Sequence, residues 1–203
     1  MLISYGFAPE PNAADYVPLY TDLREMLDDD RWAAREPARV SRAKAALLYA
    51  GAASRAPLAV RPGGLAAAAH LLGCLRMVHA DVADVARLEE RMDEHAGHLT
   101  WQWREGSDAE ADAHARMARS DAAARAHAAA RARELLDDFP TTAAEDAALL
   151  AQLQADAGAR VAVAADDEDE DGEAAAAARL LAAVRFRLGV KRMLQHCVDE
   201  ASA

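Results

Sequence analysis

The pattern of hydrophobic and polar positions predicts helices along most of the chain. Apolar residues between Leu65 and His79 recur at three- and four-residue spacings, the repeat of one helix face. The last helix has a similar apolar stripe, formed by Leu180, Leu181, Val184, Leu188 and Leu194. A long segment ending at Asp138 has a thinner stripe, formed by Ala111, Ala115, Ala118, Ala122 and Ala126 and followed by Leu135 and Leu136. Strand patterns are few, so we expect an all-α fold, an irregular bundle of roughly six to eight helices with a short extended N-terminal segment.

Helix-breaking and capping residues separate these segments. Pro140 ends the long helix, because its ring and its missing N–H do not fit a helix interior. Thr142 and Glu145 have the spacing of a capping box, which predicts the start of the next helix. The apolar face of that helix is expected from Leu149, Leu150 and Leu153. Ser41 is the expected cap of an earlier helix that ends near Gly51.

Three shorter elements are expected near the start of the chain. The segment from Tyr16 to Leu19 follows a turn rich in proline and is expected to be extended. Asp22 to Asp30 is interpreted as a short acidic helix. Leu58 to Arg61 is followed by Pro62-Gly63-Gly64 and is the best candidate for an isolated strand or strap.

Length, charge and cysteine content narrow the function classes. The chain has 203 residues, which fits one domain or one domain with an appendage. Its net charge of −11 argues against binding to the nucleic-acid backbone, which needs a basic surface, and permits basic protein segments as partners. No apolar run approaches the roughly 20 residues of a membrane-spanning helix, so no membrane partner is expected. Two cysteines, Cys74 and Cys197, predict a reducing compartment without a disulfide framework.

Charged and aromatic residues give two candidate contact regions. A basic stripe on the last helix consists of Arg179, Arg185, Arg187, Lys191 and Arg192. It is either a solvated face paired with the acidic loop at 165–173, or a contact in which Arg185 and Arg187 bind an acidic part of a protein substrate. The acidic loop is expected to be disordered, because its like charges repel. Trp101 and Trp103 form either an aromatic recognition surface or ordinary packing.

Histidine and cysteine spacings offer a weaker hypothesis. His70 and Cys74 are four residues apart, and His79 is about one turn further, so they could present metal ligands on one helix. The alternative is that they are ordinary helix residues, which the lack of a second ligand set with recognised spacing favours. His95 and His98 are a weaker pair still. We therefore expect no metal site.

Four stretches resemble one known family. Phe139-Pro140-Thr141-Thr142, followed by Glu145-Asp146 and Leu149-Leu150, resembles the "(Y/F)PTTxxED…LL" signature. This signature belongs to the C-terminal substrate-binding domain of Rubisco large-subunit-type SET lysine methyltransferases. The segment from Arg185 to Leu194 is similar to the closing "RxxEKxxL" helix, with Val190 in place of the usual acidic residue. Gly63-Gly64-Leu65 approximates the family's "GGL", and residues 2–19 resemble the end of its SET domain.

The resemblance implies a division of the chain and the loss of catalysis. Residues 1–19 would be the residual end of a SET domain, and 20–203 a helical substrate-binding domain. The family binds S-adenosylmethionine through an Asn-His-x-x-Asp motif, which is missing because Asn12 is the only asparagine and Ala13 follows it. Tyr5 matches the catalytic tyrosine of the family's "YGF" and is expected to be non-functional without a cofactor site. We expect no cofactor in this chain.

The expected function is recognition of a protein substrate for a SET-type protein-lysine N-methyltransferase, without catalysis in this form. The resemblance implies as partner the Rubisco large subunit or another lysine-methylated protein, in the cytoplasm or the chloroplast stroma. The alternative is a helical scaffold or interaction module with no methylation role. Two origins are open: a gene model truncated at its N-terminus, which the position of Met1 within the family motif favours, or a free-standing binding domain.

Overall fold

The computed structural model describes residues 15–29, 38–50, 57–80, 110–163 and 171–202. The expectations about Tyr5, Trp101, Trp103, His95 and His98 lie outside these ranges. The elements are β1 (Val17–Tyr20), α2 (Leu23–Leu27), α4 (Ala38–Ala50), β2 (Leu58–Val60), the 3-10 helix η2 (Leu65–Ala67), α5 (Ala69–His79), α7 (Glu110–Asp137), α8 (Ala143–Val163) and α9 (Asp171–Glu200). The all-α class is confirmed, with 6 α-helices and one small sheet in the described ranges.

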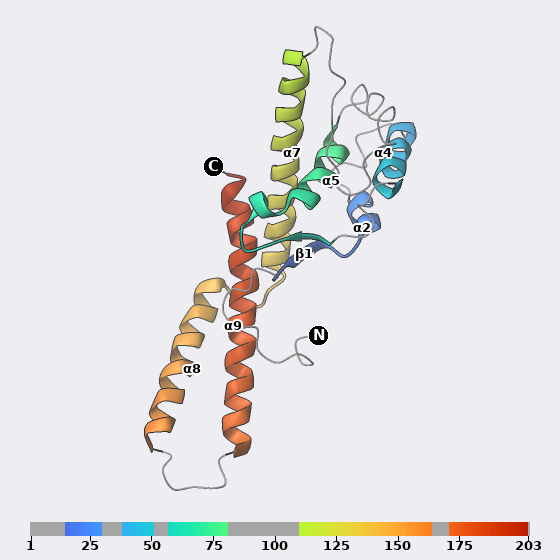
Figure 1. Ribbon diagram of the computed structural model, residues 1–203. Coiled ribbons are helices and arrows are strands. Elements are labelled where there is room, and N and C mark those ends of the chain that lie inside the picture. The colour runs from blue at the N-terminus through green and yellow to red at the C-terminus, as the bar shows by residue number, and fades with distance from the viewer. Residues whose placement is uncertain (1–14, 30–37, 51–56, 81–109, 164–170, 203) are drawn as a thin grey trace.

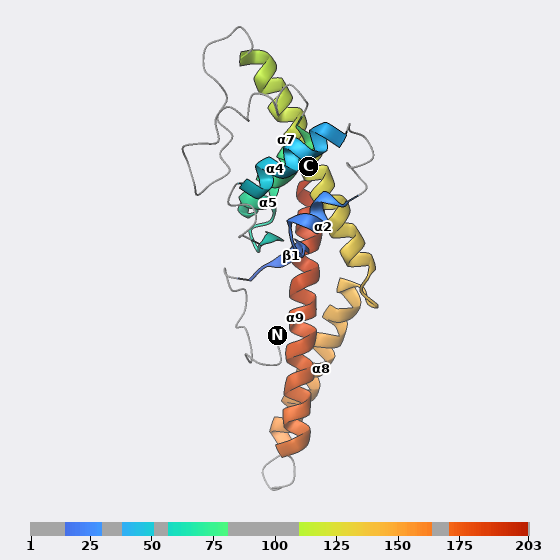
Figure 2. The same cartoon turned by 90° about the vertical axis from the view of Figure 1, so that its right-hand side faces the viewer.

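Helix α9 is the axis of the molecule (Figures 1 and 2). Helix α7 packs along its C-terminal half, and α8 packs antiparallel along its N-terminal half. The small sheet, α5, α2 and α4 gather beside α7, so that the α8–α9 hairpin projects away from this body. Within the described ranges, the projecting part of α9 packs against α8, and many residues of both helices are exposed to solvent.

The sheet pairs two strands that the sequence separates widely. β1 and β2 are antiparallel, with Val17 opposite Val60 and an irregularity between Pro18 and Tyr20. The strand at 58–60 is confirmed, but the expectation that it is isolated is wrong. A three-residue strand carries too little pattern to indicate its partner. The strand β1 also crosses the expected domain boundary at residue 19, which itself stays a prediction.

The core lies between α5, α7 and the sheet. Helix α5 is buried on nearly every side, and its buried apolar residues are Leu71, Leu72, Cys74, Leu75, Met77 and Val78. Alanines of α7 face it, namely Ala124, Ala128 and Ala132. Small side chains at four-residue spacing let the backbones of two helices approach closely, so α7 can pack tightly despite having few large apolar residues.

The expected apolar stripe of α7 has the wrong register. Ala118, Ala122 and Ala126 are exposed, whereas Ala124 and Ala128 are buried. The alanines of this helix are distributed around its whole circumference, so they do not indicate which face packs. The spacing of the alanines therefore could not predict which face of α7 is buried. The buried face is the one that packs against the larger side chains of α5.

The stripe expected on α9 is correct at Val184, Leu188 and Leu194 and wrong at one end. Leu180 is 49% exposed, because it lies in the projecting hairpin. A lysine, Lys191, occupies the buried face between Leu188 and Leu194. The basic stripe expected on this helix is therefore not one solvated surface.

Three element boundaries also differ from expectation. Helix α4 begins at Ala38, so Ser41 lies inside it and does not cap it. Ala68 divides the helix expected from Leu65 to His79 into η2 and α5. Helix α9 begins at Asp171, so 171–173 is helical, whereas the preceding part of the expected acidic loop lies outside the described ranges.

Candidate functional site

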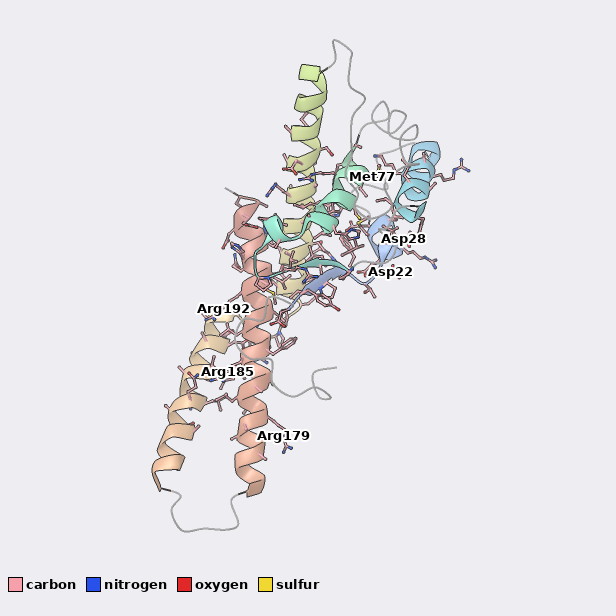
Figure 3. The ribbon with its side chains drawn as sticks, viewed as in Figure 1. Asp22, Asp28, Met77, Arg179, Arg185 and Arg192 are labelled. Atoms are coloured by element: carbon pink, nitrogen blue, oxygen red, sulfur yellow. The ribbon has the colours of Figure 1, made fainter. Side chains whose placement is uncertain are left out.

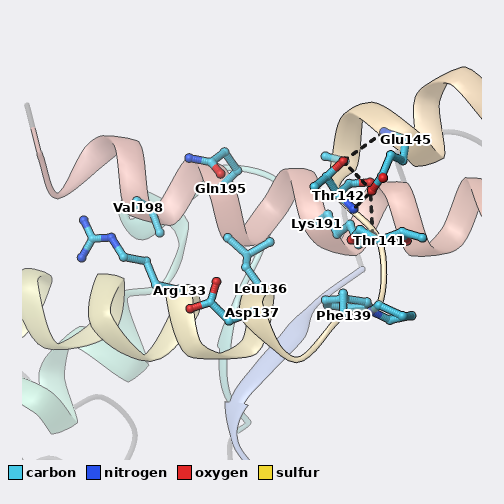
Figure 4. A pocket seen from close by; sticks show the side chains of 12 residues that line it. Arg133, Leu136, Asp137, Phe139, Thr141, Thr142, Glu145, Lys191, Gln195 and Val198 are labelled. Atoms are coloured by element: carbon cyan, nitrogen blue, oxygen red, sulfur yellow. Dashed lines mark hydrogen bonds between the residues drawn. The ribbon is translucent and has the colours of Figure 1, made fainter.

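The Phe-Pro-Thr-Thr turn joins α7 to α8 where both meet α9 (Figure 4). The expected capping box is confirmed. The N–H of Glu145 donates to Thr142 Oγ1 at 3.2 Å, and the N–H of Thr142 donates to Glu145 Oε2 at 2.6 Å. Because Pro140 cannot extend α7 and Thr142 caps α8, the sequence itself sets the position of this turn.

Asp146 holds this turn to α9. Its carboxylate accepts hydrogen bonds from the Arg187 Nε at 2.8 Å, the Lys191 Nζ at 2.7 Å and the Thr141 hydroxyl at 2.8 Å. The side chains of Asp146 and Lys191 are each only 1% exposed. A buried ion pair is stable only when further hydrogen bonds satisfy both partners, and here both have them.

Lys191 makes most of the remaining hydrogen bonds of this cluster. Its ammonium group donates to the Thr141 hydroxyl at 2.8 Å and to the Thr141 carbonyl. It also lies 4.9 Å from the centroid of the Phe139 ring, within reach of a cation–π interaction. The turn thus surrounds the lysine with acceptors, which explains how a charged residue occupies the apolar face of α9.

The electrostatics of the cluster keep Asp146 ionised. The hydrogen bond from Arg187 lowers the pKa of Asp146 well below its ordinary value of 3.8, against the opposing effect of burial. The same interaction raises the pKa of Arg187. A carboxylate held ionised by two cations is a poor proton donor or acceptor near neutral pH, so the cluster supports structure rather than acid–base chemistry.

An open groove of about 540 Å³ lies against this cluster (Figure 4). It runs between the end of α7, the turn and the C-terminal part of α9. Its lining is mixed, with apolar Leu136, Phe139, Pro140 and Val198 beside charged Arg133, Asp137, Glu145 and Lys191. This lining is suited to a peptide or side-chain contact more than to a small apolar ligand, which would need an enclosed pocket.

The structure separates the two arginines expected to bind substrate. Arg187 is directed to Asp146 and is 31% exposed, whereas Arg185 is exposed. The predicted roles of Trp101, Trp103 and Tyr5 concern residues outside the described ranges. Sequence reasoning missed Asp146 as the common acceptor. One signal could have indicated it. Arg187 and Lys191 are four residues apart, so they lie on one side of the last helix, where they can pair with the Glu-Asp pair of the turn.

A second polar cluster joins β1, the end of α2, α5 and α7. His127, buried in α7, contacts the Tyr20 hydroxyl through Nε2 at 2.7 Å and the His79 Nε2 through Nδ1 at 2.9 Å. The Tyr20 hydroxyl donates to Asp29 at 2.8 Å. Arg131 lies over the Tyr20 ring and donates to the Leu19 carbonyl at 3.0 Å. These bonds fix the sheet to α7, and no periodicity in the sequence indicated them.

Residues 38–194 match the family described as Rubisco LSMT substrate-binding. The match covers most of the chain, from the start of α4 into the last turns of α9, and includes the Phe-Pro-Thr-Thr turn with Asp146, Arg187 and Lys191. The chain belongs to the Rubisco LSMT substrate-binding family. Comparison with curated proteins and with solved structures gives no match.

In this Rubisco LSMT substrate-binding domain, His70, Cys74 and His79 are the described residues among those considered as metal ligands, whereas His95 and His98 lie outside the described ranges. His79 is part of the Tyr20–His127 cluster, and His70 Nε2 lies 3.9 Å from Cys74 Sγ. Burial raises the pKa of the Cys74 thiol to about 12, which disfavours the thiolate that a metal would require. Across the described ranges, no three His, Cys, Asp or Glu residues are placed to hold a metal ion. No helix there has the length and apolar content to span a membrane.

Proposed function

We propose that this chain recognises the protein substrate of a SET-type protein-lysine N-methyltransferase. The single observation that carries the proposal is the family match over residues 38–194. Residues 2–19 support it, because they resemble the end of a SET domain and lie N-terminal to the matched region, as in the family. The partner is then a protein that is methylated on lysine, such as the Rubisco large subunit or another protein with such a lysine.

The chain contributes binding and not methyl transfer. In a complete family member, S-adenosylmethionine bound to the SET domain would supply the methyl group that the lysine amine accepts. The residues present here do not fit that cofactor. The only asparagine is Asn12, and Ala13 follows it, so the expected Asn-His pair is missing. The buried polar side chains Lys44, His127, Asp146 and Lys191 all bind other groups of the chain.

A domain of this kind acts by raising the local concentration of the substrate lysine near a catalytic domain. Docking requires a rigid surface, and the buried Asp146–Lys191 cluster supplies rigidity where three helices meet. We propose Arg185, Arg187, Trp101 and Trp103 as substrate contacts. Arg185 is exposed, and Arg187 retains partial exposure while it binds Asp146.

The test is capture of a partner by the immobilised chain, followed by calorimetry with the purified partner. The proposal predicts saturable binding of a protein with a solvent-exposed lysine segment, and no heat when S-adenosylmethionine is titrated into the chain alone. Heat from S-adenosylmethionine would contradict the assignment as a binding domain. A captured partner that assembles with the chain but is never methylated would favour the alternative, a helical scaffold.

A further inference from the structure

The α8–α9 hairpin leaves large apolar side chains in solvent. Of the exposed large hydrophobic residues in the described ranges, three belong to the hairpin: Leu149 at 37%, Leu180 at 49% and Phe186 at 47% exposure. They belong to α8 and α9, whose hairpin projects from the body of the molecule (Figure 1). Of these three residues, Phe186 lies on the face of α9 that also carries Ala182 and Gly189. A large apolar side chain left in solvent beside other small or apolar positions is a feature of interaction surfaces.

One face of α9 is shaped to accept another helix. Ala182, Phe186 and Gly189 follow one another at spacings of four and three residues, so they lie along one side of the helix. Among the described residues, a Cβ at Gly189 would meet no atom within 4 Å, so no packing contact in that part of the chain requires a glycine there. Glycine in a helix interior costs roughly 1 kcal/mol relative to alanine. Close approach of a partner backbone explains why this position is a glycine. That backbone would lie between Ala182 and Gly189, beside the Phe186 ring.

The charges around this face have one sign. Residues 174–198 include five basic side chains and no acidic one, within a chain of net charge −11. Asp146 binds two of the five, Arg187 and Lys191. The other three, Arg179, Arg185 and Arg192, are exposed and form no ion pair with any described residue.

These three arginines flank the apolar residues. Arg179 lies seven residues before Phe186, and therefore on the same side of α9, and it projects from the side opposite α8 (Figure 3). Arg185 and Arg192 are also seven residues apart and line the adjoining side. The apolar strip thus has positive charge along its edges, an arrangement that complements a helix with an apolar face and acidic borders.

We propose that this face of α9, formed by Arg179, Ala182, Arg185, Phe186, Gly189 and Arg192, docks an acidic amphipathic helix of the protein partner. The inference rests on the proposed function, which makes a protein the ligand, and adds where and by what chemistry it binds. The acidic remainder of the chain repels such a helix, so the basic face also determines the site of docking. Attraction between exposed charges weakens as salt rises, so binding is salt-dependent.

The probe is a pair of synthetic helical peptides of about 20 residues, which span roughly 30 Å. Both have the same alanine and leucine face, with glutamate at the remaining positions of one and lysine at those of the other. Fluorescence anisotropy with the full chain should show binding of the glutamate peptide, weaker binding in higher salt, and no binding of the lysine peptide. Failure of the glutamate peptide to bind, or equal binding of both peptides, overturns the proposal.

Three variants locate the contact. Arg185→Glu with Arg192→Glu should weaken binding about tenfold or more, because two attractions become repulsions. Gly189→Gln should weaken it by a similar factor while the fold is kept, because glutamine is a good helix former and its Cβ has open space. Arg119→Glu, at an exposed position in the N-terminal half of α7, the half that lies farther from α8 (Figure 1), is the matched control and should leave binding unchanged. Equal losses in the control and the hairpin variants would refute the site.

The same variants separate this inference from the proposed function. If the unmodified chain binds its captured partner and the hairpin variants bind it equally well, the docking face is wrong and the proposed function stands. If the unmodified chain binds no protein partner, the proposed function fails. Sedimentation that shows self-association, abolished by Gly189→Gln, would assign the face to a second copy of this chain and contradict the acidic partner helix.

Discussion

Lys191 and Asp146 form a buried ion pair that fixes α9 to the turn between α7 and α8. Their Nζ and Oδ2 atoms are 2.7 Å apart, and both side chains are almost completely buried. The lysine lies within the apolar face of α9, where a charge without partners would be very costly. Since the turn supplies those partners, the sequence of the turn and the sequence of the last helix depend on each other. This relationship sets the direction of the projecting hairpin.

Removal of Asp146 should destabilise the chain more than removal of Lys191. Asp146→Ala leaves a buried ammonium without its counter-ion and takes the acceptor from Arg187, so we expect a loss of about 3–5 kcal/mol in the free energy of unfolding. Lys191→Met leaves Asp146 with Arg187 and Thr141 and should cost less, under about 2 kcal/mol. Urea denaturation followed by circular dichroism measures both losses.

The matched control for this pair is Arg185→Met. Arg185 is an exposed arginine of the same helix, and its replacement should change the free energy of unfolding by no more than about 0.5 kcal/mol. An Asp146→Ala variant as stable as this control would show that the buried pair does not support the fold.

The cluster should also make stability depend on pH in the acid range. The pKa of Asp146 is lowered in the folded state, chiefly by its hydrogen bond from Arg187, so the unfolded chain takes up a proton at higher pH than the folded one. The stabilisation is present above the unfolded value near 3.8 and is lost as the pH falls below it towards the folded pKa. Asp121 and Glu145, whose pKa values are also lowered, contribute in the same direction.

Asp146→Asn isolates the contribution of this one group. The asparagine cannot titrate, so the free energy of unfolding of the variant should fall less between neutral pH and about pH 3 than that of the unmodified chain. Urea denaturation at several pH values gives both slopes. Equal slopes would mean that Asp146 has the same pKa in the folded and unfolded states.

Two glycines should respond to alanine in opposite ways. Gly64 has a φ of 65°, and a Cβ there would lie 2.6 Å from the His196 ring and in conflict with the Glu200 carboxylate. Gly64→Ala should therefore destabilise by about 1–3 kcal/mol. Gly189→Ala should stabilise by about 0.5–1 kcal/mol, because the helix conformation suits alanine and the space is open. Thermal unfolding measures both, and a stabilising Gly64→Ala would disprove the strained turn.

The capping box gives a prediction about a single hydroxyl group. Thr142→Ala removes the acceptor for the Glu145 N–H and should lower the free energy of unfolding by about 1 kcal/mol. Thr142→Ser keeps the hydroxyl group, so its free energy of unfolding should be close to that of the unmodified chain. If serine and alanine destabilise equally, the loss comes from the threonine methyl group and not from the cap. Chemical denaturation of the three proteins decides between them.

Local signals in the sequence predicted the position of the turn and the types of the elements. The features that they did not predict depend on contacts between residues far apart in the chain. Pro140, Thr142 and Glu145 indicated the α7–α8 boundary because proline geometry and capping act within a few residues. The register of α7 was beyond prediction, since alanine has no preferred side. Tyr20 and His127 are 107 positions apart and meet only in the folded chain. Lys44 was unpredicted for the same reason, because its acceptor is the Val78 carbonyl.

The most direct test of the central claim is the methylation state of the partner. The protein captured by this chain would be purified from its cells, and its lysines would be examined by mass spectrometry. The account predicts at least one methylated lysine in or near the segment that the chain protects from hydrogen exchange. A partner that binds tightly through the same surface, with every lysine unmodified under all growth conditions, would contradict it.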